Sequence, residues 1–362
     1  MSTLNRRDVL KQISLAGAAA AAGGFSLPAL ADKPLKVGLV YPSPVAAVGW
    51  SKQHDLAREA MIAAFPGKIQ TTVIQSTGGT NAEAIFRNLA RDGHKLIFGT
   101  SFDYGTPMLK VAETMPDTVF EHCSGIKTAK NLGTFEARYF EGSYVAGVAA
   151  AKMTKSGILG FISSYPVPDV VGAVNGFLLG ARSVNPKIVC KVVWLNSWYD
   201  PGKEKAAAIT LISQGADVLQ GMTDTTTTVQ TCAEKGVWCV SYASDMAAYG
   251  PKSQLTGYVL DWSSDYIDAA KAVLAGTWRT SARWEGLAAG VVKMAPYNSL
   301  MPADAIVYVK QQEQAIIDGK LHPFAGPLKD QHGKERVASG AVLPDDEIKG
   351  INWLVDGVTA NL

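Results

Sequence analysis

The feature that most constrains the fold is a strand–helix alternation that starts twice along the chain. A first series of short apolar strands and helices begins near Leu35. A second begins with a strand at residues 157–163, directly after a long helix of small residues at residues 140–152. The strands are apolar runs without polar alternation, which is typical of parallel strands covered by helices on both faces. The two series predict an α/β protein of two doubly wound, Rossmann-like lobes joined by a hinge, with a cleft between them.

The length also suits two lobes, because a chain of 362 residues lies near the size at which one core splits. We expect a first lobe of residues 32–154 plus about 262–285, and a second of residues 155–261 plus about 286–362. The segment 321–340, rich in proline, glycine and charge, is expected to be a surface loop. The expected strands are residues 35–41, 69–75, 95–99, 119–123, 157–163, 188–195, 218–220, 237–242, 255–260 and 286–294. The expected helices are residues 50–64, 81–91, 107–113, 140–152, a segment ending at 185–186, 202–214, 227–235, 266–274 and 304–318.

Residues 1–31 have the pattern of an export signal. Paired arginines in Asn5-Arg6-Arg7 precede an apolar run rich in alanine and glycine, and Ala29-Leu30-Ala31 has the small residues of a cleavage site. The pattern resembles a twin-arginine signal, and an amphipathic N-terminal helix is the alternative. No cysteine lies at the cleavage point, and no later stretch reaches the roughly 20 apolar residues of a membrane span. We expect a soluble periplasmic protein that is not lipid-anchored.

Charge argues against a nucleic-acid partner. The formal net charge of +2 falls to about zero without residues 1–31, which carry Arg6, Arg7, Lys11 and Asp8. The basic surface that nucleic-acid binding needs is therefore not expected. An apolar fraction of 47% with 18% charged residues is that of an ordinary globular protein.

The four cysteines lie in apolar strand-like or helical patterns without a paired spacing. An oxidising compartment permits disulfides, and Cys190 and Cys239 could lie on neighbouring strands. Buried, unpaired thiols are the favoured interpretation, since sequence alone does not fix connectivity. The cysteines are Cys123, Cys190, Cys232 and Cys239.

The loops that follow the strands are expected to line the cleft, because ligands of doubly wound sheets bind beyond the carboxyl ends of the strands. Nearly every such loop carries an aromatic ring or a carboxylate, and residues 164–169 are expected to form part of the wall. This composition suits a flat, uncharged ligand that forms hydrogen bonds. The candidate ligand-binding residues are Trp50, Ser101, Phe102, Tyr104, Trp198, Asp224, Thr225, Asp245 and Trp262.

The aromatic candidates each have a functional and a structural interpretation. Trp50 and Trp198 follow strand ends in different lobes and are expected to hold an aromatic ligand between them. Phe102 and Tyr104 follow one strand end and are expected to form an edge wall. Trp262 is a weaker candidate of the same kind. Packing in the core is the alternative role for each ring.

The polar candidates follow strand ends in the same way. Asp245 is expected to be the main polar contact, because charge-assisted hydrogen bonds are the strong ones. Asp224, Thr225 and Ser101 are further candidates for hydrogen bonds to the ligand. A helix cap or a turn is the alternative role for each.

Catalytic motifs are absent from the sequence. It has no G-x-S-x-G elbow, P-loop or G-x-G-x-x-G fingerprint. The five histidines are scattered, and Glu121-His122-Cys123 are consecutive in a strand, where side chains alternate between faces. No catalytic residue, metal or cofactor is therefore predicted. The remaining enzyme hypothesis is an exported hydrolase that uses Asp224 and Asp245 as a carboxylate pair.

A series of short segments occurs in the order and spacing of a known family. They are residues 141–150, Gly160, and residues 168–171, 177–181, 185–186, 200–203, 214–218 and 244–245. On these segments the chain resembles the basic membrane protein (BMP) family, the nucleoside- and nucleobase-binding receptors of ABC importers. The resemblance covers essentially the whole chain after residue 31, and residues 139–186 are its most specific part.

The resemblance implies a type I periplasmic binding protein without catalysis or cofactor, whose two lobes close on a small molecule by hinge bending. It implies a receptor, expected to be a monomer, that delivers its ligand to membrane permease and ATPase subunits. Nucleoside receptors of the family usually carry an acidic residue and an Asp-x-Ser-Phe-Asn-like segment after the first strand. Here residues 42–50 keep an aromatic residue, Trp50, without the carboxylate and Asn. A free purine base such as adenine is therefore favoured. A purine nucleoside is the runner-up, and a sugar or amide receptor of the same fold is a third possibility.

Overall fold

A computed structural model describes residues 33–360 of the chain, and a compact unit begins at Leu35. The predicted export signal lies outside the described residues. Within residues 33–360, no helix combines the length and the apolar character needed to cross a membrane.

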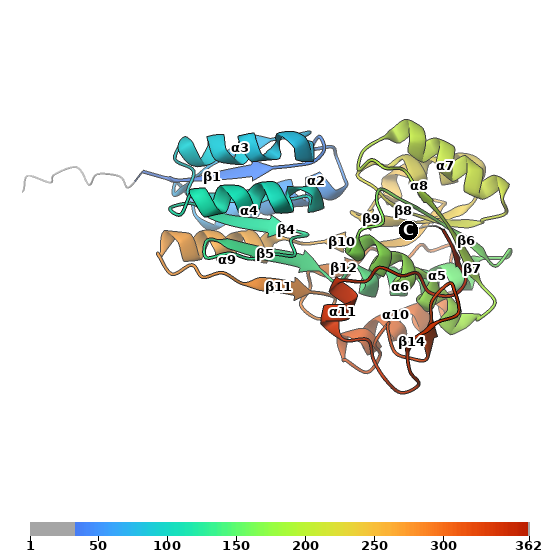
Figure 1. Cartoon of the computed structure of the whole chain (residues 1–362). Helices are drawn as coiled ribbons and strands as arrows, with labels where there is room; N and C mark the ends of the chain where they lie inside the picture. The colour runs from blue at the N-terminus through green and yellow to red at the C-terminus, as the bar shows by residue number, and fades with distance from the viewer. Residues whose placement is uncertain (1–32, 361–362) are drawn as a thin grey trace, which may run out of the picture. The chain divides into compact units, whose positions relative to one another are not determined.

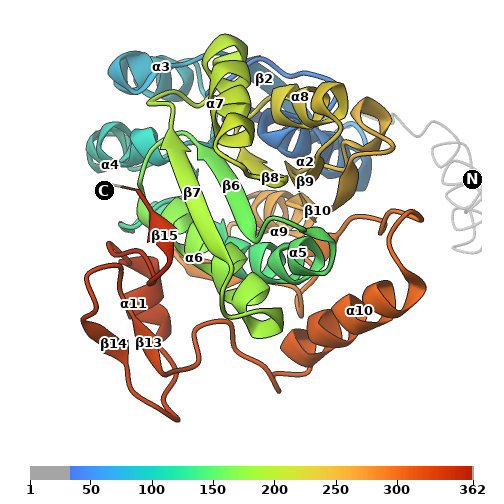
Figure 2. The ribbon, with the colours of Figure 1, turned by 90° about the vertical axis from the view of Figure 1, so that its right-hand side faces the viewer.

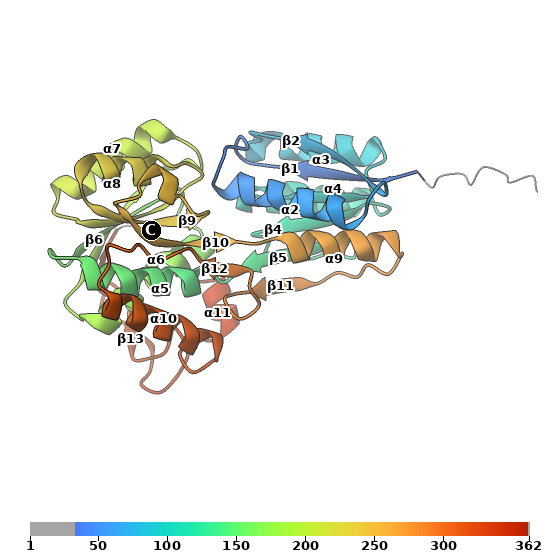
Figure 3. The same ribbon diagram turned by 180° about the vertical axis from the view of Figure 1, so that it is seen from behind.

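The first sheet consists of parallel strands in the order β11-β5-β4-β3-β1-β2. Helices α2 and α9 pack together on one face, and α3 and α4 pack together on the other (Figures 1 and 3). The strands are β1 (Leu35–Val40), β2 (Ile69–Ile74), β3 (Leu96–Gly99), β4 (Val119–Cys123), β5 (Leu132–Ala137) and β11 (Ala282–Glu285). The helices are α2 (Trp50–Ala64), α3 (Gly79–Arg91), the short η1 (Phe102–Tyr104), α4 (Gly105–Thr114) and α9 (Ser263–Leu274).

The second sheet has the order β12-β10-β9-β8-β6-β7-β15, and only β12 pairs antiparallel. Helices α7 and α8 pack together on one face, while α5 and α6 cover the other, with α10 beside α5 (Figure 2). The strands are β6 (Ile158–Ser163), β7 (Val189–Trp194), β8 (Val218–Met222), β9 (Trp238–Ala243), β10 (Gln254–Leu260), β12 (Val292–Met294) and β15 (Val358–Thr359). The helices are α5 (Tyr139–Met153), α6 (Pro168–Val184), α7 (Pro201–Ser213), α8 (Thr227–Lys235), the short η2 (Ala247–Tyr249) and α10 (Ala303–Ile317).

The small residues of α5 and α6 allow the two helix backbones to touch. A Cβ atom built on Gly147 would lie 2.0 Å from the carbonyl oxygen of Phe177, and one on Gly180 would lie 1.9 Å from that of Tyr144. Helix α5 therefore packs on α6 and on β10 of the second sheet. The lobe boundary expected near residue 154 needs correction, because the chain passes to the second lobe before α5 begins rather than after it ends.

Three chain segments connect the lobes: β5 to α5, β10 to α9, and β11 to β12. Backbone hydrogen bonds join them, from Arg138 N to Glu285 O at 2.8 Å and from Asp261 N to Val291 O at 2.9 Å. Crossings of this kind serve as hinges in proteins whose domains close around ligands. The fold is that of a two-lobed, type I periplasmic binding protein.

The chain beyond α10 differs from the surface loop expected at residues 321–340. It forms a hairpin of β13 (Leu328–Lys329) and β14 (Glu335–Val337), then α11 (Asp345–Lys349), and ends in β15 beside β7. Phe324 in this segment is fully buried. The Asn175 side chain binds the tail through Trp353 O and Val355 N, both at 2.9 Å. The isolated apolar residues of this segment, which stand among prolines, glycines and charged residues in the sequence, thus pack in the core of the second lobe.

The four cysteines are buried, as expected, and each is a free thiol in the structure. Cys190 lies on β7 and Cys239 on β9, and β6 and β8 separate these two strands. The alternative in which this pair occupies neighbouring strands is therefore wrong.

Candidate functional site

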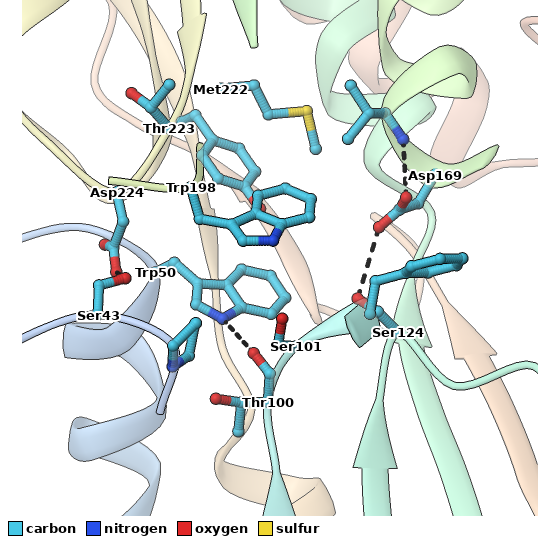
Figure 4. Close-up of a pocket in the computed structure, with 14 residues that line it drawn as sticks. Ser43, Trp50, Thr100, Ser101, Ser124, Asp169, Trp198, Met222, Thr223 and Asp224 are labelled. Carbon is cyan, nitrogen blue, oxygen red and sulfur yellow. Dashed lines mark hydrogen bonds between the residues drawn. The ribbon is translucent and has the colours of Figure 1, made fainter. Parts of the chain in front are cut away.

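A pocket lies where the carboxyl ends of the strands of the two lobes face each other (Figure 4). The first lobe contributes the loops after β1, β3 and β4, and the second contributes the loops after β6, β7 and β8 and the end of β9. The space between the lobes, counting its opening to solvent, is about 450 Å³. The lining residues are Pro42, Ser43, Trp50, Thr100, Ser101, Phe102, Ser124, Asp169, Val170, Trp198, Met222, Thr223, Asp224 and Tyr242.

Trp50, the first residue of α2, is a rigid wall of this pocket. Its Nε1 donates a hydrogen bond to Thr100 O at 2.8 Å, and the residue is only 8% exposed. The rings of His54 and Trp262 pack edge-to-face against the indole at centroid distances of 4.7 and 5.7 Å. Tyr242 lies nearly parallel to it at 6.3 Å. Burial holds the pKa of His54 well below its ordinary value, so the imidazole is neutral.

Trp198 enters the pocket from the second lobe, as Figure 4 shows. Its Nε1 donates a hydrogen bond to Asp103 Oδ2 of the first lobe at 2.9 Å. The Tyr165 ring packs beside it, with 5.3 Å between centroids. The two lobes therefore present one indole each to the same pocket.

Asp224, which follows β8, is bound to the first lobe rather than free in the pocket. Its Oδ2 accepts hydrogen bonds from Ser43 Oγ at 2.6 Å, from Ser51 Oγ at 2.7 Å and from Ser51 N at 3.2 Å. The carboxylate is 5% exposed. Burial raises its pKa, and the hydrogen bonds oppose that rise by stabilising the charged form.

Asp169 provides a second carboxyl group, at the first turn of α6. Its Oδ1 accepts a hydrogen bond from Val170 N at 2.9 Å, while Ser124 Oγ lies 3.5 Å from its Oδ2 and 3.2 Å from Oε1 of Glu136. Burial raises the pKa of Asp169 to about 6. Burial and the nearby Asp169 charge raise the pKa of Glu136 well above its ordinary value, against the charge of Lys349. This part of the pocket therefore takes up a proton more readily than ordinary carboxylates do.

A second cavity of about 400 Å³, counting its opening to solvent, adjoins the pocket. Phe102, Ser124 and Asp169 line both spaces. Glu136 and Lys349 line only the second one. The two spaces therefore share a wall formed by residues of both lobes.

A family model described as ABC transporter substrate-binding protein, PnrA-like (Bmp), matches residues 35–323. The chain belongs to the Bmp family. It is a substrate-binding protein of an ABC transporter rather than an enzyme, and proteins of this class bind small molecules and interact with a membrane permease.

Two relatives of this Bmp protein match most of its length. A purine-binding protein of Brucella abortus (strain 2308) is 46% identical over 346 residues, which cover 95% of this chain and 99% of that protein. A putative ABC transporter glucose-binding protein of Haloferax volcanii is 34% identical over 287 residues, which cover 79% of this chain and 73% of that protein.

Among solved structures, an ABC transporter solute-binding protein from Aeropyrum pernix K1 aligns with a TM-score of 0.69 at 16% identity. The alignment covers 82% of this chain and 93% of that one. A solute-binding protein from Conexibacter woesei aligns with a TM-score of 0.63 at 21% identity, covering 80% of this chain and 98% of that one. At these identities the likeness concerns the fold.

Five of the nine sequence-predicted residues line the pocket of the Bmp protein: Trp50, Ser101, Phe102, Trp198 and Asp224. They come from both lobes, and the structure brings them together because all follow strand ends or begin the helices after them. Their contact with a ligand stays a prediction.

The other four are not among the lining residues. Tyr104 is fully buried and donates a hydrogen bond to Thr77 O at 2.6 Å. Thr225 donates one to the buried Glu204 at 2.6 Å. Trp262 is fully buried behind Trp50. The two rings therefore pack in the core, which is their structural alternative. Thr225 also accepts a hydrogen bond from Thr227 N at 3.0 Å, so it takes the turn or cap role that is its alternative.

Asp245 differs most from expectation. It is exposed, and its Oδ1 accepts hydrogen bonds from Ala247 N at 2.9 Å and Gln254 Nε2 at 2.7 Å. It therefore stabilises a local turn outside the pocket. The hypothetical hydrolase pair of Asp224 and Asp245 does not form, because only Asp224 faces the pocket. Within residues 33–360 no cluster of histidine, cysteine and acidic residues has the arrangement of a metal site.

Ser124, Asp169, Thr223 and Tyr242 also line the pocket, although none of them is among the nine predicted residues. Asp169 lies at the end of the 164–169 segment expected to form the wall, and its place beside Pro168 at a helix start was the available signal. Ser124 directly follows β4, but it is neither aromatic nor acidic, so its residue type did not indicate a place in the pocket.

Proposed function

We propose that this Bmp protein binds a free purine base, such as adenine, between Trp50 and Trp198 and delivers it to the permease and ATPase subunits of an ABC importer. The observation that carries the proposal is the pair of indoles that enter one pocket from opposite lobes (Figure 4). Stacking of a base on an aromatic side chain contributes on the order of 1 to 3 kcal/mol. The 46% identity to the Brucella purine-binding protein supports a purine as the ligand.

Asp169 is the polar group that best suits the edge of the base. The oxygens of Asp224 face the first lobe, whereas Oδ2 of Asp169 is approached only by the longer Ser124 contact of 3.5 Å. A carboxylate there accepts N–H hydrogens of a purine through charge-assisted hydrogen bonds. In this proposal Asp169 takes the role that the sequence suggested for Asp245.

The second candidate is a purine nucleoside, and the adjoining cavity favours it. A base stacked on Trp50 would leave that cavity for a ribose, whose hydroxyls suit the carboxylates of Glu136 and Asp169. The free base remains the first choice, because the loop after β1 lacks the carboxylate and Asn of nucleoside receptors.

We also propose that residues 1–31 direct the protein to the periplasm, where it acts as a monomer without a lipid anchor. The paired arginines and the small-residue cleavage pattern support export. Processing at residue 31 and the oligomeric state are checked by mass spectrometry and sedimentation of the protein recovered from the periplasm.

Calorimetric titration tests the ligand assignment. Protein comprising residues 32–362 is titrated with adenine, adenosine, inosine and glucose, and each mixture is then analysed by chromatography for product. The proposal predicts saturable one-site binding of adenine, weaker binding of the nucleosides and recovery of every ligand unchanged. Tighter binding of adenosine than adenine would favour the second candidate. Heat with glucose alone would refute a purine receptor, and any product would refute a pure receptor.

A further inference from the structure

Helix α2, which carries Trp50, has no cap of its own. The residue before it is Gly49, which offers no side chain, and its first turn has no acidic residue. The free N–H groups at a helix start need partners, and the positive end of the helix dipole favours an anion there. Ser51 is fully buried and Trp50 nearly so, so solvent does not supply those partners.

The second lobe supplies them. Asp224, after β8, accepts hydrogen bonds from Ser51 N and Ser51 Oγ. Ser244, after β9, accepts one from Gly49 N at 2.8 Å and one from Gln53 Nε2 at 2.7 Å. Both residues are buried. The N-terminus of a first-lobe helix is thus capped by two strand-end residues of the other lobe.

Gly49 makes the close approach possible. Its φ of 110° is a conformation that favours glycine. A Cβ atom built there would lie 2.3 Å from Asp224 Oδ1. A side chain at this position is therefore incompatible with the observed position of Asp224.

We propose that Asp224 and Ser244 form an interlobe latch, which caps α2 when the lobes close and so holds Trp50 opposite Trp198. When the lobes separate, the first turn of α2 loses these partners and Trp50 moves away from Trp198. Asp224 is then a positioning residue that acts through α2 rather than a ligand contact. The effect of the latch on affinity depends on the proposed role of Trp50, but its effect on lobe closure does not.

The test measures closure and binding separately. Spin labels are placed on K110C in α4 and K203C in α7, because the native lysine side chains are 60% and 59% exposed. The distance between the two labels is measured by pulsed electron paramagnetic resonance, without and with adenine. The native cysteines are buried and do not compete for the label. Adenine dissociation is followed by stopped flow.

The latch variants are Asp224→Asn and Gly49→Ala. Asparagine keeps the shape but presents an NH₂ group or a weaker acceptor to three hydrogen-bond donors. The matched control for the first is Asp217→Asn, because Asp217 precedes β8 and accepts N–H bonds from Lys155 and Ser156 within one lobe. The matched control for the second is Gly78→Ala, at the start of α3, where φ is ordinary and a Cβ has open space.

Without adenine, we expect more molecules of both latch variants than of the wild type to show the longer distance between the labels. We expect adenine to dissociate at least about tenfold faster from both variants than from the wild type, as for loss of a charged hydrogen bond. The controls should keep the wild-type distances and dissociation rate, with only the melting temperature lowered in Asp217→Asn. Wild-type distance distributions in both latch variants would overturn the latch. Faster dissociation in Asp224→Asn with unchanged distances would instead make Asp224 a ligand contact. If no purine binds, the proposed function fails, and the distances without ligand still decide the latch.

Discussion

At the scale of single residues, Trp50 is the most constrained part of the pocket. Its indole N–H is bound to a backbone carbonyl and its ring is packed against His54 and Trp262, so contacts within the first lobe hold the ring. Preorganised aromatic walls bind flat ligands at a low cost in side-chain entropy.

Trp50→Ala is therefore expected to weaken adenine binding by about tenfold or more, as loss of one stacking contact of on the order of 1 to 3 kcal/mol implies. Calorimetric titration measures the change. Trp238→Phe is the control, because Trp238 is the first residue of β9 and lies at the opposite end of that strand from the pocket residue Tyr242. Unchanged adenine affinity in Trp50→Ala would contradict the stacking model.

The raised pKa of Asp169 predicts a specific pH dependence of the free energy of unfolding. Burial raises its pKa from 3.8 to about 6. Between these values the folded protein holds a proton that the unfolded chain has released, so this carboxyl makes the free energy of unfolding fall as pH rises from about 4 to 6. Asp169→Asn should remove that fall.

The measurement is urea unfolding of both proteins from pH 4 to 7 without ligand. The stability of Asp169→Asn relative to wild type should increase with pH and level off above about 6. A difference that stays constant across the range would show that Asp169 titrates as an ordinary carboxyl.

At the scale of elements, close packing of α5 on α6 explains why the 139–186 segment is rich in glycine and alanine. A Cβ on Gly180 would meet a backbone oxygen at 1.9 Å, whereas one on Gly172 of the same helix would approach only Ile351, at 3.9 Å. Gly180→Ala should lower the free energy of unfolding by about 2 kcal/mol or more, since the backbones must separate. Gly172→Ala should be neutral or slightly stabilising. Thermal and urea unfolding compare the two, and equal effects would contradict backbone contact at Gly180.

Sequence patterns predicted the strands of the two lobes well where the strands are continuous apolar runs. They missed β5, Leu-Gly-Thr-Phe-Glu-Ala, because glycine, threonine and glutamate interrupt its apolar character. Its burial comes from β4 and β11 on either side, and β11 joins it from residue 282 onward. The 321–340 segment was missed for a related reason, since its few apolar residues are buried by the rest of the second lobe.

At the scale of the molecule, the carboxyl ends of the parallel strands predicted where the pocket lies. They did not predict which loops meet across it. Asp224 and Asp245 both follow strands of one sheet, yet one binds the first lobe and the other a local turn. The difference depends on the rotation of the lobes about three crossings, and no local pattern encodes that rotation. Asp169 and Ser124 come together for the same reason.

Lobes that close on a purine base should keep it bound after free ligand is removed. The most direct measurement saturates purified residues 32–362 with an equimolar mixture of adenine, adenosine and glucose, removes free ligand by rapid desalting, denatures the protein and identifies the released molecule by mass spectrometry. We expect adenine at close to one molecule per chain, and its loss in Trp50→Ala. Retention of glucose, or of no purine at all, would contradict this expectation.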